Sequence, residues 1–359
     1  MRTAVVLFNL GGPDSLESVR PFLYNLFSDK AILGIPAPIR QIIARMIAKR
    51  RAPIARDIYA QIGDRSPILP ETQKQANAID QALSPKSESA VFISMRYWHP
   101  LVRETIKEVE KYNPDRIILL PLYPQFSSTT TGSSFKSWWD GVRGTALEER
   151  ETITICSYPN AEGFIAGQAG LIDKAIGTLN CSEFRLLMSA HGLPEKNIKK
   201  GDPYQEQVEL TAKSITEKLN RKGLDWVVCY QSKVGPLEWI KPSTESEIRR
   251  AVSDDKVLII VPIAFVSEHS ETLVELDIEY KDLAIEAGAK KYIRVPALGD
   301  NKNYISSLVS LIENALSAAD NNSLKAGIGP NGVRLVCPKE HINRCSFCIK
   351  EKENSAHGR

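Results

Sequence analysis

The chain has 359 residues, enough for about two domains, and its 43% hydrophobic and 25% charged residues are typical of a globular protein with a full-sized core. A formal net charge of +3 is too small to indicate nucleic-acid binding, and no basic run is interleaved with aromatic residues. No stretch reaches the roughly 18 apolar residues of a membrane-spanning helix. The N-terminal sequence MRTAVVLFNLGGP predicts a strand entering a Gly-Gly turn rather than a signal peptide. We therefore expect a cytoplasmic protein.

Strand-like and helix-like segments alternate along the chain. Short runs rich in Val, Ile and Leu predict buried parallel strands at residues 3–9, 90–95, 116–121, 152–156, 185–190, 226–229, 257–264 and 291–295. Helices are predicted between them at 101–112, 162–178, 203–221, 243–252, 270–287 and 302–318, with Ser243 and Ser270 as helix caps. The alternation predicts an α/β fold with right-handed crossovers.

The predicted strands divide into two similar halves with about four strands each. We place the N-terminal α/β lobe at 1–155 and the C-terminal α/β lobe at 156–305. Residues 306–359 hold the end of the last helix, a polar Gly-rich linker at 320–334 and a cysteine-containing tail.

Residues 31–56 differ from the rest of the chain because they contain no acidic residue. Apolar side chains share one helical face there: Ile39, Ile42, Ile43, Met46 and Ile47. Six basic residues surround that face: Arg40, Arg45, Lys49, Arg50, Arg51 and Arg56. One interpretation is a surface helix that packs its apolar stripe on the core. The other is an interfacial helix at the lip of a pocket, which contacts a membrane or an apolar, anionic ligand.

His191 follows the strand-like run FRLLMSA and precedes Gly192-Leu193-Pro194. Gly192 permits unusual backbone angles, and Pro194 prevents immediate continuation into a helix. The carboxyl ends of parallel strands are where such sheets build their sites. An imidazole placed there can accept a proton at neutral pH, so we predict a catalytic role for His191.

The sequence Glu268-His269-Ser270-Glu271 follows another buried run, VLIIVPIAFVS. A capping box at a helix start explains Ser270 and part of Glu271, but it does not explain His269. Acidic residues continue at Glu275, Asp277 and Glu279. Like charges four apart on a helix are mildly unfavourable, so the pattern predicts a cation-handling surface.

Aromatic residues and one arginine follow three other predicted strands. They are Arg96 and Tyr97 in RYWHP, Tyr123 in LYPQ, and Trp239 in the loop after 226–229. Together they indicate a flat, apolar ligand with acidic edges, although ordinary loop packing is the alternative. Walker A and GxGxxG patterns are missing from the sequence, so no nucleotide cofactor is expected.

Three cysteines lie close together near the C-terminus, at Cys337, Cys345 and Cys348. Three thiolates suit zinc or an iron–sulfur cluster. His341 would complete a zinc site, whereas a distant residue such as Cys156 would complete a cluster. A redox dithiol at Cys345 and Cys348 is a third interpretation.

These motifs resemble the ferrochelatases, which insert ferrous iron into a porphyrin to make haem. The matching stretches are FNLGGP, IAKRRAP, RYWHP, LYPQFSSTTTGSS, SAHGLP, YQSKVGP and PIAFVSEHSETLVELDIEY, in order over residues 8–280. The resemblance implies two Rossmann-like lobes, each with a four-stranded parallel sheet flanked by helices, and an active-site cleft between them. It also implies porphyrin and Fe²⁺ as the substrates, with protohaem as the product when the porphyrin is protoporphyrin IX.

The resemblance further implies a role for each matching residue. His191 would take a pyrrole proton or bind the entering iron on one face of the macrocycle, with Glu271, His269 and Glu268 as an acidic path on the other. The porphyrin would contact Leu10, Arg96, Tyr97, Tyr123 and Trp239. A 2Fe–2S cluster on Cys156, Cys337, Cys345 and Cys348 is implied by some family members, with structural zinc as the alternative.

Two further readings and two properties of the chain stay open. The chain is alternatively a non-catalytic haem- or metal-binding protein, or a chelatase for another tetrapyrrole such as coproporphyrin or for another metal such as cobalt. Residues 31–56 resemble an apolar lip that contacts the inner membrane peripherally, and this favours protoporphyrin. Monomer and homodimer are equally compatible with the sequence.

Overall fold

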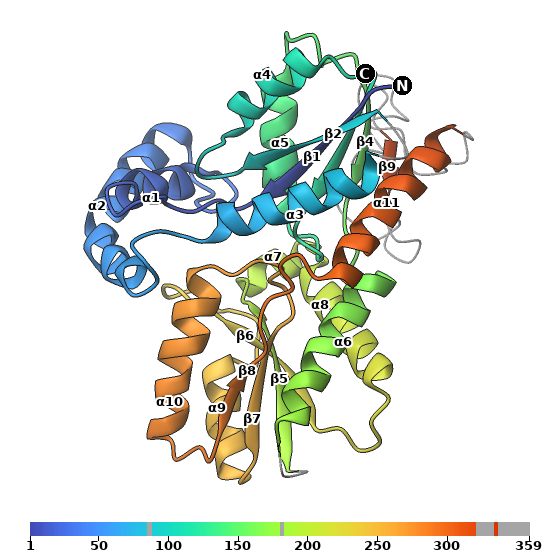
Figure 1. Cartoon of the computed structure of the whole chain (residues 1–359). Coiled ribbons are helices and arrows are strands. Elements are labelled where there is room, and N and C mark those ends of the chain that lie inside the picture. The colour runs from blue at the N-terminus through green and yellow to red at the C-terminus, as the bar shows by residue number, and fades with distance from the viewer. Residues whose placement is uncertain (85–87, 180–182, 321–333, 337–359) are drawn as a thin grey trace. The chain divides into compact units, whose positions relative to one another are not determined.

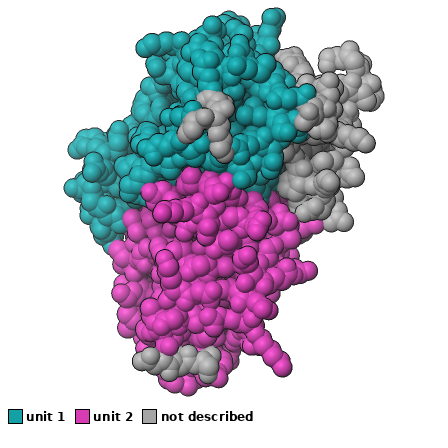
Figure 2. Space-filling view, turned by 45° about the vertical axis from the view of Figure 1, so that its right-hand side comes forward, with its two compact units in different colours: residues 1–158, 308–359 teal, residues 159–307 magenta. Residues whose placement is uncertain are grey.

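The computed structural model describes residues 1–84, 88–179, 183–320 and 334–336. The chain forms two compact units (Figure 2). Unit 1 is Met1–Tyr158 with Leu308–Arg359, and unit 2 is Pro159–Ser307. The last helix, α11 (Lys302–Asp320), contains the second boundary.

Unit 1 is built on a parallel sheet whose strands run in the order β2-β1-β3-β4-β9. The strands are β1 (Thr3–Asn9), β2 (Ser89–Met95), β3 (Arg116–Pro121), β4 (Glu151–Ile155) and β9 (Arg334–Val336). Every residue of β1 and β3 is buried, because helices cover both faces of the sheet (Figure 1). Strand β9 was not predicted, since three residues are too few to show a periodic pattern.

Unit 2 contains a four-stranded parallel sheet in the order β6-β5-β7-β8. Its strands are β5 (Phe184–His191), β6 (Trp226–Gln231), β7 (Val257–Pro262) and β8 (Tyr292–Arg294). All eight predicted strands are therefore present, and the predicted class of two parallel α/β lobes is confirmed.

The helices of unit 1 are α1 (Val19–Ser28), α2 (Ala37–Ala60), α3 (Ile68–Leu83), α4 (Val102–Tyr112) and α5 (Thr131–Val142). Those of unit 2 are α6 (Glu162–Gly177), α7 (Glu195–Lys199), α8 (Tyr204–Leu219), α9 (Thr244–Ser253), the π-helix η1 (Glu271–Glu279) and α10 (Tyr280–Glu286). In unit 2, α6 and α8 lie on one face of the sheet and α9 and α10 on the other (Figure 1). The six predicted helices are present, although the one predicted at 270–287 begins as a π-helix.

The core of unit 1 shows how alternation along a strand builds a layer. Alternate residues of β1, namely Ala4, Val6 and Phe8, face α4 and α5. The Phe8 ring meets Phe135 and Trp138 edge to face, with ring centroids 5.7 and 6.0 Å apart. This packing fixes the carboxyl ends of β1 and its neighbours.

The two predicted helix caps have different outcomes. Ser243 caps α9, because its hydroxyl accepts a hydrogen bond from the Ser246 amide at 3.2 Å. Ser270 does not cap η1: it has helical backbone angles and its side chain makes no capping bond. The Thr272 hydroxyl oxygen accepts a hydrogen bond from the His269 amide at 3.0 Å instead. The cap predicted at Ser270 is therefore wrong.

Helix α2 does not pack its isoleucine face on the core. Its buried residues are Tyr59 and a row of three small side chains, Ala44, Ala48 and Ala52, against which α1 can approach closely. Ile39, Ile42 and Met46 are 54%, 60% and 66% exposed. The core-packing interpretation is therefore wrong for these three side chains, whereas Ile43 and Ile47 are half-buried. None of the described helices is long and apolar enough to cross a membrane.

Candidate active site

His191 is the last residue of β5, in register with Gln231 at the end of β6. Its Nδ1 lies 2.6 Å from the carbonyl oxygen of Gly192 and donates to it, because a carbonyl only accepts. In the neutral ring this leaves Nε2 without a hydrogen. That nitrogen lies 3.8 Å from Glu271 Oε2, so the structure brings together the two predicted catalytic residues.

The turn after His191 requires glycine. A Cβ atom on Gly192 would lie 3.0 Å from the carbonyl oxygen of Gln231 and 3.0 Å from the Trp239 ring. The Gly192 amide donates to that same carbonyl at 2.8 Å. This close approach places Trp239 beside His191, with ring centroids 6.2 Å apart.

Three glutamates spaced four residues apart lie along η1: Glu271, Glu275 and Glu279, here called the acidic row. The i→i+5 turns of a π-helix are rare and often mark functional sites. Burial and the nearby charge of Glu275 raise the pKa of Glu279. Glu279 therefore keeps its proton to a higher pH than an ordinary glutamate.

Glu275 is held by four donors. Its Oε1 accepts from the Ser232 amide at 2.7 Å and the Tyr280 hydroxyl at 3.0 Å, and its Oε2 accepts from Gln231 Nε2 at 2.8 Å and the Ser232 hydroxyl at 2.5 Å. These bonds hold the Glu275 carboxyl group in one orientation in the middle of the acidic row, whereas the Glu271 side chain is 28% exposed beside His191.

Gln231 connects the His191 turn to the acidic row and is only 1% exposed. Its Nε2 donates to the Glu271 carbonyl at 3.0 Å as well as to Glu275. Its Oε1 accepts from Ser189 at 2.8 Å, which fixes the orientation of the amide. The sequence pattern could not assign Gln231 a role, because its side-chain partners come from two other elements, β5 and η1.

Glu268 belongs to a different network. It accepts from Arg294 at 2.6 Å, from the Ala297 amide at 2.9 Å and from Thr272 at 2.5 Å. Burial favours the protonated acid, but the charge of Arg294 and these bonds outweigh it and lower the pKa of Glu268. Glu268 is thus held in an ion pair with Arg294, and its place in the acidic path with Glu271 stays a prediction.

His269 is half-buried, and its ring meets Phe265 edge to face at 4.9 Å. Its Nδ1 is buried without a hydrogen-bond partner among the residues that the structure describes. An unpaired buried nitrogen costs free energy unless a ligand or water completes it. The ring is thus a candidate ligand for a cation next to Glu271.

The contact between His191 and Glu271 bears on how a macrocycle could lie here. A flat ring between the two side chains would need about 7 Å, twice the roughly 3.5 Å contact distance of stacked atoms. Their 3.8 Å separation leaves no such space between the side chains as they stand. The arrangement with imidazole and carboxylate on opposite faces of a macrocycle therefore stays a prediction.

The other predicted ligand-binding residues lie in unit 1. Arg96 and Tyr97 follow β2; the Arg96 side chain is 22% exposed, but Tyr97 is fully buried and supports its neighbour. Tyr123 is half-buried, and burial of its hydroxyl raises its pKa. Leu10 is half-buried against the cluster that contains Phe22 and Tyr97.

Cys156 directly follows β4 and is fully buried. Cys337, Cys345 and Cys348 lie outside the described residues. The nearest described element is β9, whose Val336 pairs with Ile155 of β4. The sequences continue from that pair as Cys156 and Cys337.

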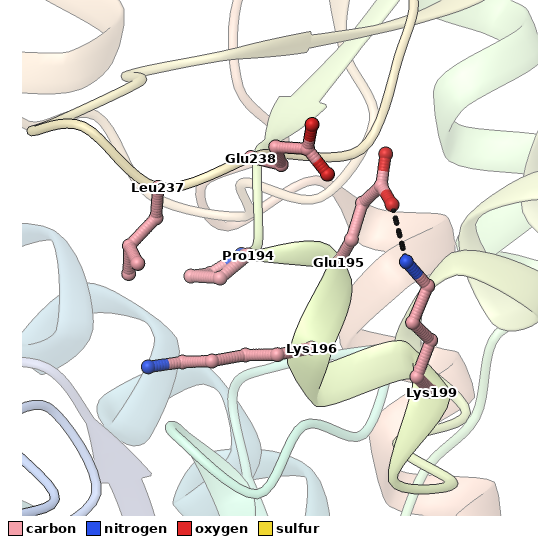
Figure 3. Close-up of a pocket in the computed structure, with 6 residues that line it drawn as sticks. All are labelled: Pro194, Glu195, Lys196, Lys199, Leu237 and Glu238. Carbon is pink, nitrogen blue, oxygen red and sulfur yellow. Dashed lines mark hydrogen bonds and ion pairs between the residues drawn. The ribbon is translucent and has the colours of Figure 1, made fainter.

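A hollow of about 200 Å³ lies on unit 2 between α7 and the loop before Trp239 (Figure 3). It is lined by Pro194, Glu195, Lys196, Lys199, Leu237 and Glu238. Glu195 and Lys199 pair across one side at 2.9 Å. Ligand pockets usually exceed about 300 Å³, and none of the predicted site residues lines this hollow, so we assign it no ligand.

Comparison with known proteins shows the family of the chain. The ferrochelatase family model matches residues 2–316. Ferrochelatase of Pelagibacter ubique is 52% identical over 315 residues, covering 87% of this chain and 91% of that protein. Ferrochelatase of Rickettsia canadensis is 49% identical over 352 residues, covering 97% and 99%. Among solved structures, SirB from Bacillus subtilis with Fe³⁺ shares the fold alone, with a TM-score of 0.53, 11% identity and coverage of 89% and 98%. The chain belongs to the ferrochelatase family.

Proposed function

We propose that this chain inserts Fe²⁺ into protoporphyrin IX to form protohaem, with release of two protons, as the last step of haem biosynthesis. Family membership supports the reaction class. The observation that carries the mechanism is the position of His191 Nε2, which lies 3.8 Å from the carboxylate of Glu271 while Nδ1 contacts the Gly192 carbonyl. A base and a metal-binding oxygen therefore lie side by side.

The chemistry divides between these two groups. The macrocycle loses two N–H protons as its four nitrogens bind Fe²⁺. The two positive charges that the iron brings therefore leave as two protons. Nε2 of His191 accepts a pyrrole proton, and Glu271 lies next to it to stabilise the imidazolium. Carboxylate oxygens bind a hard divalent cation without holding it as tightly as thiolates do, so Glu271 can deliver the iron.

The rest of the acidic row supports this exchange. Glu275, held by four donors, provides a negative charge that attracts the incoming cation. Glu279, whose pKa is raised by burial and by Glu275, takes up a proton more readily than an ordinary carboxylate. The row thus brings cations toward His191 and carries protons away from it.

Anaerobic assay of the protein with protoporphyrin and Fe²⁺ tests the proposal. The Soret band should shift from that of the free base to that of haem over many turnovers. Binding of one equivalent without turnover would instead indicate a haem- or metal-binding protein. Rates with coproporphyrin and with Co²⁺ decide the alternative chelatase activities.

We also propose that α2 contacts the inner membrane peripherally. The exposed apolar side chains of Ile39, Ile42 and Met46 are flanked by exposed Lys49 and Arg50, and such a face suits an anionic lipid surface. Flotation with anionic vesicles tests this proposal. Ile42→Ser should reduce binding, whereas Ile285→Ser in α10 is a matched control because both residues are 60% exposed. Equal binding by both variants would contradict it.

We propose a 2Fe–2S cluster on Cys156, Cys337, Cys345 and Cys348. Cys156 follows the residue of β4 that pairs with the residue before Cys337, and thiolates suit such a cluster. Visible absorption and iron analysis of the purified protein distinguish a cluster from colourless zinc. Cys156→Ser should lose the colour. The control Cys229→Ser, also fully buried, should keep it. A colourless zinc protein would overturn the proposal.

A further inference from the structure

Arg294 is the last residue of β8, the strand at one edge of the sheet in unit 2, and its guanidinium binds two carboxylates. Its Nη1 donates to Glu268 at 2.6 Å, while its Nε and Nη2 donate to the two oxygens of Asp277 at 2.9 and 2.5 Å. Glu268 lies three residues before Glu271, and Asp277 lies six residues after it. One cation therefore holds the chain on both sides of Glu271.

The guanidinium of Arg294 is fixed in this position. All three of its nitrogens donate to the two carboxylates, and its donors lie in one rigid plane. The side chain is only 11% exposed. Burial opposes the charged form, but the bonds and charges of Asp277 and Glu268 outweigh it and raise the pKa of Arg294.

Arg294 binds η1 on the side away from the acidic row. Asp277 lies two residues from each of its two nearest neighbours in that row, and helical residues two apart do not share a face. Strand β8 makes a second contact with η1, because the Tyr292 hydroxyl donates to the Leu276 carbonyl at 2.5 Å. The helix is therefore held to β8 by groups outside the acidic row.

We propose that Arg294 is a positioning residue for metal insertion, which holds η1 so that Glu271 stays beside Nε2 of His191. This inference rests on the proposed function. Among the described residues, Arg294 shares no hydrogen bond or ion pair with either of those two, so it acts through Glu268 and Asp277. Reacting groups need close alignment, and a displacement of about 1 Å can slow a reaction severely.

The variant Asp277→Asn tests this role, because it keeps the shape of the side chain and removes the charge that Arg294 binds. We expect kcat for Fe²⁺ insertion to fall about tenfold, the scale of a lost charge-assisted hydrogen bond, while KM for porphyrin stays within about twofold. An unchanged kcat would overturn the proposal.

The matched control is Asp225→Asn, which weakens a similar ion pair in the same unit. Its partner Arg185 also binds two carboxylates and is 8% exposed, and Asp225 is 35% exposed against 36% for Asp277. Arg185 lies near the start of β5, whereas His191 ends that strand. The control should keep kcat within about twofold of the wild type, and an equal fall in both variants would contradict the proposal.

A double-mutant cycle separates positioning from a purely structural role. If Arg294 acts through the placement of Glu271, Asp277→Asn should have little further effect on kcat in the Glu271→Gln background. A general loss of stability would lower kcat by the same factor in both backgrounds, and that result would reject the positioning role.

Hydrogen exchange of the peptide covering residues 268–279, measured by mass spectrometry, tests the proposal without the reaction. Its amides should exchange about tenfold faster in Asp277→Asn and at the wild-type rate in Asp225→Asn. Unchanged exchange in Asp277→Asn would overturn the proposal. Faster exchange together with a wild type that does not insert Fe²⁺ would reject the proposed function alone.

Should Asp277→Asn fail to fold in a thermal melt, Arg294→Lys decides by the same two measurements. Lysine keeps the positive charge but loses the planar fork that reaches both carboxylates. Wild-type kcat and wild-type exchange in Arg294→Lys would then reject the role of Arg294.

Discussion

At the scale of single residues, the tautomer of His191 determines what the site can do. The bond from Nδ1 to the Gly192 carbonyl leaves Nε2 free to accept a proton, and the lack of space around Gly192 holds that turn in place. A side chain at position 192 would push Trp239 or Gln231 away. The proton acceptor therefore depends on a glycine as much as on the imidazole.

We expect His191→Ala to reduce Fe²⁺ insertion at least about 10²-fold, the lower end of what a general base contributes. The fold should persist, because the side chain lies at the end of β5 and is 37% exposed. Added imidazole should restore part of the activity, measured by the Soret shift under anaerobic conditions. Turnover near the wild-type rate would reject the role of His191 as base.

The pairing of Glu268 with Arg294 predicts a pH-dependent contribution to stability. The pKa of Glu268 is lowered in the folded chain, so its contribution is present above the unfolded value of about 4.3 and is lost as pH falls through the folded value. Glu268→Gln should lower the free energy of unfolding by about 2 kcal/mol at pH 7, since the pair is only 21% and 11% exposed. In urea titrations the difference should shrink below about pH 4, and a constant difference would contradict the assignment.

At the scale of elements, the sequence predicted the strands well because buried apolar runs are a local signal. It missed β9, which is too short for a pattern, and it read the isoleucine face of α2 as core in one of two interpretations. The alanines of α2 contact the core instead, because small side chains let α1 approach closely. The π-helical geometry of η1 could not be predicted either, since its acidic pattern equally fits an α-helix.

The link between β6 and η1 is testable through Gln231. Gln231→Leu removes a hydrogen-bond donor to Glu275 and the bond to the Glu271 carbonyl. The glutamates of the acidic row should therefore shift from their present positions. We expect kcat to fall about tenfold with little change in KM for porphyrin, the cost of one or two displaced hydrogen bonds. Gln168→Leu on α6 is the matched control, because Gln168 is also fully buried, and equal losses in both variants would contradict this link.

At the scale of the whole chain, each unit places predicted site residues after the carboxyl ends of parallel strands. His191 and Glu271 were selected from the sequence because each follows a strong strand signal. Gln231 and Arg294 could not be, because the partners of each are distant in sequence. The placement of His191 and Glu271 in contact was also beyond sequence reasoning, since it depends on the path of the loop before η1.

The most direct measurement is the anaerobic rate of Fe²⁺ insertion by Glu271→Gln, with Glu217→Gln on α8 as the control. Glu217 is 66% exposed and distant in sequence from the acidic row. The account predicts a loss of at least about 10²-fold for Glu271→Gln with porphyrin binding retained, and no loss for the control. Insertion by Glu271→Gln within about threefold of the wild type would contradict the central claim that the contact between His191 and Glu271 carries the reaction.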